Sequence, residues 1–215
     1  MTTPRCMPWT WYVDNDMVFF IFMPWLMMIY KKNRKIAYIT YFLLILSNVI
    51  YLFTVTMVAD LPGFVTIDSP RYNKYIYRKP WGRYAAYVAG IIIGCMYFEY
   101  RNHEKHERFR NSFGTKLFTF LERSRVFRIV FFFIGWAFIN LAIFVHLPEQ
   151  KGFTYSTWPT WANAIFNSVS RPTFIMGLFM VLAGCFVGGN RVISYFMNAP
   201  IFNSWAKVSF MTYLI

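Results

Sequence analysis

The sequence predicts an all-α membrane protein, a polytopic transmembrane helix bundle with five full spans and a truncated sixth. Of its 215 residues, 57% are hydrophobic and only 14% are charged, whereas soluble globular chains carry about 25% charged residues. Aromatic residues reach 22% of the chain. The apolar residues also cluster in runs close to the ~20 residues that cross a bilayer as a helix. This composition excludes a disordered tail and a disulfide-rich secreted scaffold.

The first predicted span covers residues 12–30. Its most apolar part, Met17 to Tyr30, is short and contains Pro24, but an extension back to Tyr12 gives enough length. The aromatic residues before Met17 then lie at the membrane interface. No basic region precedes this span and a basic run, residues 31–35, follows it. The segment is therefore not a cleavable signal peptide, and we expect the N-terminus on the extracytoplasmic side.

The next three predicted spans cover residues 36–58, 84–100 and 126–147. Asn48 and Asn140 lie inside two of these apolar runs, where we expect interhelical hydrogen bonds. Gly90 and Gly94 have the four-residue spacing that permits close approach of a second helix. We expect a polar connection at residues 60–83 and a charged loop at residues 101–125.

The C-terminal part predicts an interfacial segment at residues 161–170 and a fifth span at residues 172–187, with Pro172 at the start of the helix. Gly188 and Gly189 are expected to cap its end. A sixth apolar run, residues 206–215, would cover only ~15 Å, half a bilayer. We therefore expect one partial membrane domain over residues 1–215, truncated at its C-terminus and also lacking N-terminal helices.

The net charge of +13 follows the loops between the apolar runs. With the N-terminus outside, fourteen of the 22 Lys and Arg residues fall on the cytoplasmic side and eight on the other. Cytoplasmic loops attract basic residues, so topology accounts for the charge and we expect no nucleic-acid partner. The location predicted is integral to the plasma membrane or an endomembrane, with the lipid bilayer as a partner.

Four local patterns occur along the chain in a characteristic order. They are Trp9-Thr-Trp-Tyr-Val-Asp-Asn-Asp16, Pro80-Trp-Gly-Arg83 followed by Tyr87-Val-Ala-Gly90-Ile-Ile-Ile-Gly94, Ser170-Arg-Pro-Thr173, and Lys207-Val-Ser-Phe-Met-Thr-Tyr213-Leu. In this order they resemble the nose-resistant-to-fluoxetine-like branch of the acyltransferase 3 family, which consists of multi-pass membrane acyltransferases. The resemblance covers essentially the whole chain.

This resemblance implies a bundle of about ten helices that moves an acyl group from a cytoplasmic donor, expected to be acyl-CoA, to a hydroxyl acceptor on or across the membrane. The chain corresponds to the C-terminal part of such a domain. The family's acyl-transfer His is expected upstream of Met1, so the fragment alone is expected to be inactive. Acyl-CoA would be a co-substrate, and no bound cofactor is expected.

Asp14, Asn15 and Asp16 are candidates for a polar wall at the outer mouth of a substrate cavity, and Asp16 matches the family pattern. Capping of free N–H groups in the first helical turn explains the two acids equally well. Arg83 and Arg171 are candidates for contacts with a headgroup, because a positioned guanidinium suits phosphate or carboxylate. An Arg at a membrane edge also extends its charge to water without any ligand.

His146, at the outer end of the fourth predicted span, is the weak candidate for a general base within the chain. His103 and His106 do not have the spacing of a zinc motif, so no metal site is predicted. Two other functions stay open at this point. One is a membrane transporter or lipid-handling protein built on the same helices, and the other is a non-catalytic subunit of a membrane assembly.

Overall fold

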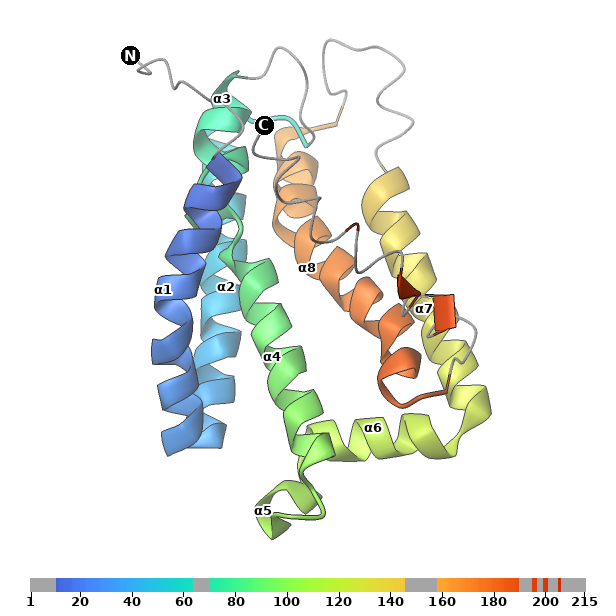
Figure 1. Ribbon diagram of the computed structural model, residues 1–215. Coiled ribbons are helices and arrows are strands. Elements are labelled where there is room, and N and C mark those ends of the chain that lie inside the picture. Colours follow the sequence, from blue (N-terminus) through green and yellow to red (C-terminus); the bar gives the residue numbers. More distant parts are fainter. Residues whose placement is uncertain are drawn as a thin grey trace. The chain divides into compact units, whose positions relative to one another are not determined.

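The computed structural model (Figure 1) describes residues 11–63, 70–145 and 158–189, with residues 195–196, 199–200 and 205 beyond them. This part of the chain is all-helical and contains no strand, which confirms the predicted fold class. Its elements are α1 (Trp11–Lys32), α2 (Arg34–Ala59), α3 (Pro70–Tyr72), the π-turn η1 (Asn73–Tyr77), the 3₁₀ turn η2 (Pro80–Gly82), α4 (Tyr84–Arg101), α5 (Glu107–Arg110), α6 (Phe113–Arg123), α7 (Arg125–Phe144) and α8 (Thr160–Phe186).

Four of these helices, α1, α2, α7 and α8, are long and apolar enough to cross a membrane. Their outward faces carry large apolar side chains, such as Phe20, Phe42 and Phe133, which are 69, 64 and 60% exposed. Exposed apolar surface of this extent is typical of contact with lipid. The chain is therefore an integral membrane protein. The third predicted span corresponds to α4, which at 18 residues is about 27 Å long but is not one of these four helices. The sixth predicted span lies outside the described residues.

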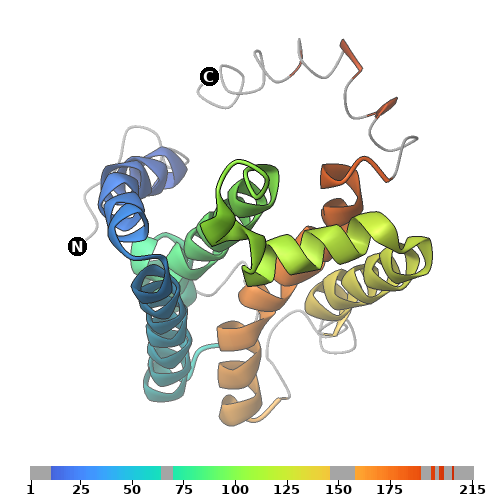
Figure 2. The same cartoon turned by 90° about the horizontal axis from the view of Figure 1, so that it is seen from below.

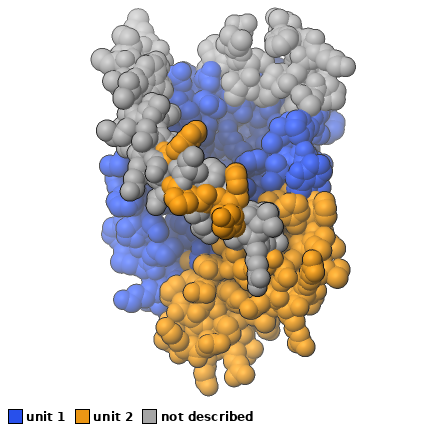
Figure 3. All heavy atoms as spheres, turned by 45° about the vertical axis from the view of Figure 1, so that its right-hand side comes forward, with its two compact units in different colours: residues 1–94, 136–178 blue, residues 95–135, 179–215 orange. Residues whose placement is uncertain are grey.

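The chain divides into two compact units, coloured separately in Figure 3. The first comprises residues 1–94 and 136–178, and the second comprises residues 95–135 and 179–215. Three long helices, α4, α7 and α8, contribute residues to both units. Each unit has its own packing, and each is described by itself.

In the first unit, α1 and α2 lie side by side as an antiparallel pair (Figure 1). Asn33 separates them and caps α2, because its side-chain oxygen accepts from the backbone N–H groups of Lys35 and Ile36 at 3.0 and 3.3 Å. Such a cap satisfies amides that have no partner inside the helix. The hydroxyl of Tyr41 in α2 donates to the carbonyl of Leu26 in α1 at 2.7 Å. The turn at Asn33, within the basic run of residues 31–35, therefore sets the antiparallel arrangement of α1 and α2.

The far end of α2 packs against the following connection and the start of α8. Leu52, Leu61, Tyr72 and Ile76 form a buried apolar cluster there. Beside it, Asn167 of α8 is 3% exposed. Its side-chain amide donates to the Thr56 hydroxyl (3.3 Å) and the Pro62 carbonyl (3.0 Å), and its side-chain oxygen accepts from the Tyr72 hydroxyl (3.4 Å). These bonds fasten α8 to the end of α2 and the segment after it.

In the second unit, α6 runs from the end of α4 to the start of α7 (Figures 1 and 2). Gly114 of α6 touches the backbone of Met96 in α4, where an added Cβ would come within 2.8 Å of the Met96 Cα. Phe118, fully buried, packs against Tyr97, Phe179 and Phe186 with ring centroids 5.7, 6.1 and 6.5 Å away. Edge-to-face aromatic contacts of this kind stabilise a core beyond their buried area.

The structure corrects four expectations from the sequence. Residues 101–125 contain α5 and the amphipathic helix α6 instead of a charged loop. Helix α8 is continuous from Thr160 and passes through Pro172, because neighbouring packing lets membrane helices tolerate the N–H that proline lacks. No described atom comes within 4 Å of a Cβ built on Gly90 or Gly94, so they mediate no close approach in this part of the chain. Asn140 donates to Trp136 one turn earlier in its own helix.

Two other local expectations are confirmed. The side-chain amide of Asn48 donates across to the Trp81 carbonyl of η2 at 2.5 Å. At the end of α8, Gly188 has a φ of +70°, the left-handed conformation of a C-terminal helix cap. The N–H groups of Gly188 and Gly189 donate to the carbonyls of Cys185 and Gly184 at 3.1 and 3.0 Å.

Candidate functional site

Arg83 follows directly after η2, a turn that the sequence fixes at several points. Pro80 begins the turn, since its locked φ suits the first position of a helix. The buried Asn48 of α2 holds the Trp81 carbonyl. At Gly82, an added Cβ would lie 2.5 Å from the Ile76 carbonyl oxygen, so the chain passes too close to η1 for any side chain. The backbone before Arg83 is thus held from two directions.

The side chain of Arg83 is held between two aromatic rings. Its Nε donates to the Tyr77 carbonyl at 2.8 Å. Its guanidinium carbon lies 4.6 Å from the ring centre of Trp11 and 4.7 Å from that of Tyr77. Both distances are within the range of cation–π attraction. These contacts fix the guanidinium plane and use only one of its five N–H donors.

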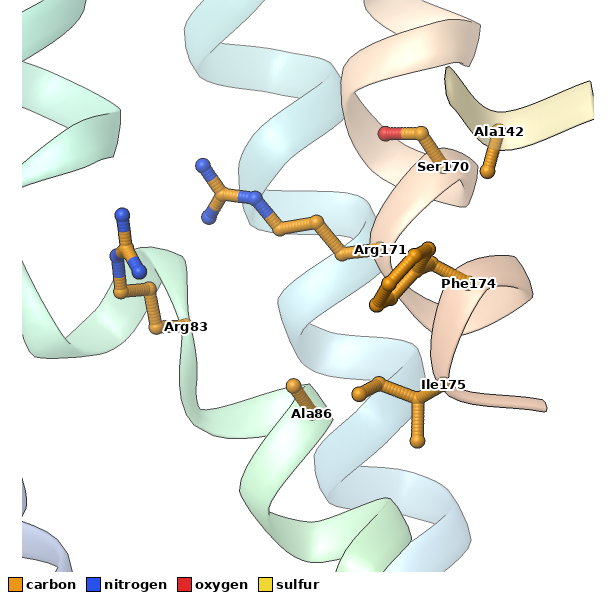
Figure 4. Close-up of a pocket in the computed structure, with 7 residues that line it drawn as sticks. All are labelled: Arg83, Ala86, Ala142, Ser170, Arg171, Phe174 and Ile175. Carbon is orange, nitrogen blue, oxygen red and sulfur yellow. The ribbon is translucent and has the colours of Figure 1, made fainter. Parts of the chain in front are cut away.

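Arg171 reaches the same turn from α8. One of its Nη1 N–H groups donates to the carbonyl of Gly82, the residue that precedes Arg83. The turn η2 therefore connects the two arginines: its last residue accepts from Arg171, and the next residue is Arg83. In Figure 4 the Arg171 side chain extends from α8 toward the side on which Arg83 lies.

Both arginines line a cavity of about 310 Å³ within the first unit. Three of its lining residues, Arg83, Arg171 and Ser170, are cationic or polar, and the others are apolar (Figure 4). Ser170 contributes a hydroxyl next to Arg171. The other lining residues are Ala86 of α4, Ala142 of α7, and Phe174 and Ile175 of α8. The cavity therefore combines two cations with an apolar wall from three helices.

The electrostatics of the cavity are strongly positive. Burial lowers the pKa of Arg83, and the positive charge of Arg171 lowers it further, while Tyr77, Tyr72 and Tyr12 act in the opposite direction. A guanidinium nevertheless stays protonated in proteins. Among the described residues, no carboxylate pairs with either arginine. Two like charges thus share a partly desolvated space.

The structure places two of the predicted site residues in one cavity, and Asp14, Asn15 and Asp16 are not among the residues that line it. Arg83 and Arg171 line one cavity. Asp14 and Asp16 are exposed on α1 and do not line it. Asn15, between them, is 4% exposed and its amide donates to the Arg78 carbonyl at 3.4 Å, so it fastens α1 to the connection before η2. His146 lies outside the described residues.

Sequence reasoning missed the remaining cavity residues. Ser170 with Phe174, and Arg171 with Ile175, are four residues apart in α8, which places each pair on one face of the helix. The four-residue spacing from Ser170 and Arg171 was the sequence signal that could have identified Phe174 and Ile175 as neighbours of the predicted Arg171. Ala86 and Ala142 gave none, because alanine is common in every apolar helix.

No group of three or more metal-ligating side chains gathers within the part of the chain that the structure describes. The ring Nδ1 of His103 lies 2.5 Å from the Tyr100 carbonyl oxygen, and its ring stacks on that of Tyr100 with centroids 5.8 Å apart. These contacts give His103 a local packing role at the end of α4.

Comparison with known proteins gives a consistent family match. The family model described as "Acyltransferase domain", Acyl_transf_3, matches residues 1–215. The chain is also 23% identical over 222 aligned residues to "Nose resistant to fluoxetine protein 6" of Caenorhabditis elegans. That alignment covers 98% of this chain and 25% of the relative, so the chain spans about a quarter of the relative's length. No solved structure matches the chain significantly.

Proposed function

Because the chain belongs to the acyltransferase 3 family and resembles its nose-resistant-to-fluoxetine-like branch, we propose that the protein transfers an acyl group from acyl-CoA to a hydroxyl acceptor at the membrane. The observation that carries this proposal is the family match over all 215 residues. The proposal concerns the whole protein, since the relative is about four times longer than the region it shares with this chain.

The reaction needs a base, an acceptor oxygen and a leaving thiol. A general base takes the proton of the acceptor hydroxyl, and the oxygen attacks the carbonyl carbon of the thioester. The C–O bond of the ester forms as the C–S bond breaks, and the CoA sulfur leaves with the electron pair and takes up a proton. We propose that a His of a helix outside these 215 residues acts as the base. His146 is the candidate within them.

The described residues would contribute binding and positioning to this reaction. The apolar faces of α1, α2, α7 and α8 would keep the site at the level of the lipid. The cavity with Arg83 and Arg171 would hold a charged part of a substrate. Asp14 and Asp16, exposed on α1, are proposed to contact headgroups at the outer mouth.

We propose that the N-terminus is extracytoplasmic and that the protein resides in the plasma membrane or an endomembrane. The excess of basic residues in segments 31–35 and 101–128 supports this orientation, because such residues are retained on the cytoplasmic side. The donor acyl-CoA would then meet the face that carries α5 and α6.

A paired assay tests the function. The full protein, purified into liposomes, is given acyl-CoA with a labelled acyl group and a mixture of hydroxylated lipids and sugars. We expect protein-dependent label in an ester that hydroxylamine cleaves. Protein-dependent lipid flux without any ester would instead identify a transporter or lipid-handling protein. Absence of both, with a copurifying membrane protein, would identify an assembly subunit.

A further inference from the structure

The cavity around Arg83 and Arg171 has an electrostatic property that the fold does not explain. Two guanidinium groups share it, and no carboxylate among the described residues pairs with either. Their mutual repulsion lowers the pKa of Arg83 in addition to the effect of burial. Placing like charges in a partly desolvated space costs free energy that an anion between them would offset. The arrangement therefore fits a bound anion better than an empty cavity.

The arginines are held in place by contacts that leave most of their donors available. The Nε of Arg83 donates to the Tyr77 carbonyl, and its guanidinium makes cation–π contacts with the rings of Trp11 and Tyr77. Arg171 uses one Nη on the Gly82 carbonyl. Each guanidinium carries five N–H groups, so several remain for a ligand, and the Ser170 hydroxyl lies in the same cavity. Side chains fixed before binding lose little conformational entropy when the ligand arrives.

The number of donors distinguishes among oxyanions. A carboxylate offers two oxygens and is satisfied by one guanidinium fork, whereas a phosphate offers enough oxygens for two forks and a hydroxyl. Two arginines and a serine therefore match a phosphate better than a carboxylate.

The other walls define the rest of the ligand. Ala86, Ala142, Phe174 and Ile175 are apolar and come from three helices. The volume of about 310 Å³ is at the lower end of that for small-molecule sites, roughly 300–1,000 Å³. It can hold a phosphate with the first carbons of an attached chain. A ligand with a phosphate at one end and hydrocarbon at the other would satisfy both parts of the lining.

We propose that Arg83, Arg171 and Ser170 bind the phosphate group of a membrane amphiphile, whose apolar part lies against Phe174 and Ile175. The role of this amphiphile as the acyl acceptor, anchored by its phosphate, rests on the proposed function. Binding itself does not depend on that function and is measured without an acyl donor.

Three probes separate the parts of the ligand. The full protein in an uncharged detergent is titrated with phosphatidic acid, with glycerol phosphate and with diacylglycerol, and binding is read by native mass spectrometry. We expect phosphatidic acid to bind most tightly, because only it carries both phosphate and chains. Equal binding of glycerol phosphate would overturn the lipid assignment in favour of a soluble phosphate ester. Equal binding of diacylglycerol would overturn the phosphate site.

Matched variants locate the site. Ser170→Asp places a carboxylate in the cavity while it leaves both arginines and their carbonyl contacts in place, and Ser170→Asn is its uncharged control of the same size. We expect Ser170→Asp and Arg171→Gln both to weaken phosphatidic acid binding by about tenfold or more. Arg171→Gln removes charge-assisted hydrogen bonds to the phosphate, and the carboxylate of Ser170→Asp pairs with the arginines and repels the phosphate. Ser170→Asn, which loses the hydroxyl without adding a charge, should weaken binding less than Ser170→Asp does. Arg110→Gln, which removes an exposed charge of α5, should retain binding.

Ser170→Asp and Arg171→Gln test the same site in different ways. If Arg171→Gln does not fold, Ser170→Asp still tests the site, because it removes no contact that the structure describes. Undiminished phosphatidic acid binding in Ser170→Asp would overturn the proposal. If the wild-type protein binds phosphatidic acid but shows no acyl transfer, that result would count against the proposed function alone.

Discussion

Gly82 shows how a single missing side chain shapes the cavity. A Cβ at this position would lie 2.5 Å from the Ile76 carbonyl oxygen, a distance that real atoms avoid, and the Gly82 carbonyl also receives the hydrogen bond from Arg171. The substitution Gly82→Ala should therefore push η2 away from η1. We expect a cost of about 1–3 kcal/mol, typical of overpacking, observed as a lower Tm of the protein in detergent.

The control for this prediction is Gly90→Ala in the neighbouring helix α4. No described atom lies within 4 Å of a Cβ at Gly90, and alanine favours a helix over glycine. Gly90→Ala should therefore keep or raise the Tm. Equal Tm values for the two variants would mean that the approach of η2 to η1 contributes nothing to stability.

Asn167 is a second residue on which the stability of the first unit should depend. It is buried, and its loss would leave the Pro62 carbonyl and the Thr56 and Tyr72 hydroxyls without this partner. Groups left unsatisfied in the interior cost about 1–3 kcal/mol each. We expect Asn167→Leu to lower the Tm by far more than Asn140→Leu, because within the described residues Asn140 bonds to Trp136 of its own helix and to no other helix. Thermal unfolding of both variants in the same detergent gives the comparison, and similar losses would contradict it.

The sequence predicted the residues whose chemistry is unusual for their surroundings, but not their partners. Arg83 and Arg171 were identified from short family-like patterns and from the suitability of a guanidinium at a membrane edge for phosphate or carboxylate, and Asn48 was identified as an amide inside an apolar run. The importance of Asn167 and Gly82 depends on Pro62 and Ile76, which approach them only in the folded chain. Periodicity along one helix contains no information about such partners.

At the scale of elements, α6 depends on a cap that comes from the next helix. The Nη1 of Arg128 in α7 donates to the carbonyls of Leu121 and Glu122 at 2.8 and 2.7 Å. The last carbonyls of a helix have no partner within it, and a cation there also interacts favourably with the helix dipole. Gly189 leaves room for this side chain, since a Cβ would lie 2.6 Å from the Arg128 Nε.

We therefore expect Arg128→Met to loosen the end of α6 while it keeps the apolar stem of the side chain. Hydrogen bonds to charged groups contribute about 1.5–3 kcal/mol. Amide hydrogen exchange over residues 113–123 should become faster in the full protein. Arg125→Met, which removes an exposed charge at the first residue of α7, is the control and should leave exchange unchanged. Identical exchange in the two variants would exclude the capping role.

The elements that the sequence predicted well are those with long apolar runs. Helices α1, α2 and α7 start and end within a few residues of the predicted spans. Helix α6 was missed because it is short and lies in a segment rich in charged residues, and only one of its faces, with Gly114, Thr115, Phe118 and Leu121, is buried. Helix α8 was divided because Pro172 ends most helices of soluble proteins, whereas a membrane helix supported by neighbours can continue through it.

At the scale of the whole molecule, the proposed orientation in the bilayer rests on the distribution of basic residues along the sequence. We expect a cysteine at Lys105, in the basic segment before α5, to react with a membrane-impermeant maleimide only after the membrane is permeabilised. A cysteine at Lys74 should react in intact cells when the protein is expressed at the plasma membrane. Both side chains are exposed, and the three native cysteines, Cys6, Cys95 and Cys185, are replaced in the background. The reverse pattern would place the N-terminus in the cytoplasm.

Composition predicted the fold class and the membrane location at this scale, and the serial order of four short motifs predicted the family. Both predictions rest on the length of apolar runs and on local residue order, which can be read from the sequence without knowledge of tertiary contacts. The cavity is different in kind. It assembles Ala86, Ala142 and Ser170 from three helices, so only the folded chain reveals it.

The central claim is acyl transfer from a cytoplasmic donor by a membrane-embedded protein. The most direct measurement supplies acyl-CoA labelled in its acyl group to sealed membrane vesicles that contain the full protein in one known orientation. Acyl-CoA does not cross the bilayer, because its phosphates are charged. We predict protein-dependent, hydroxylamine-sensitive ester in inside-out vesicles and none in right-side-out vesicles. Absence of ester in both orientations, with the protein folded and present in the membrane, would contradict the claim.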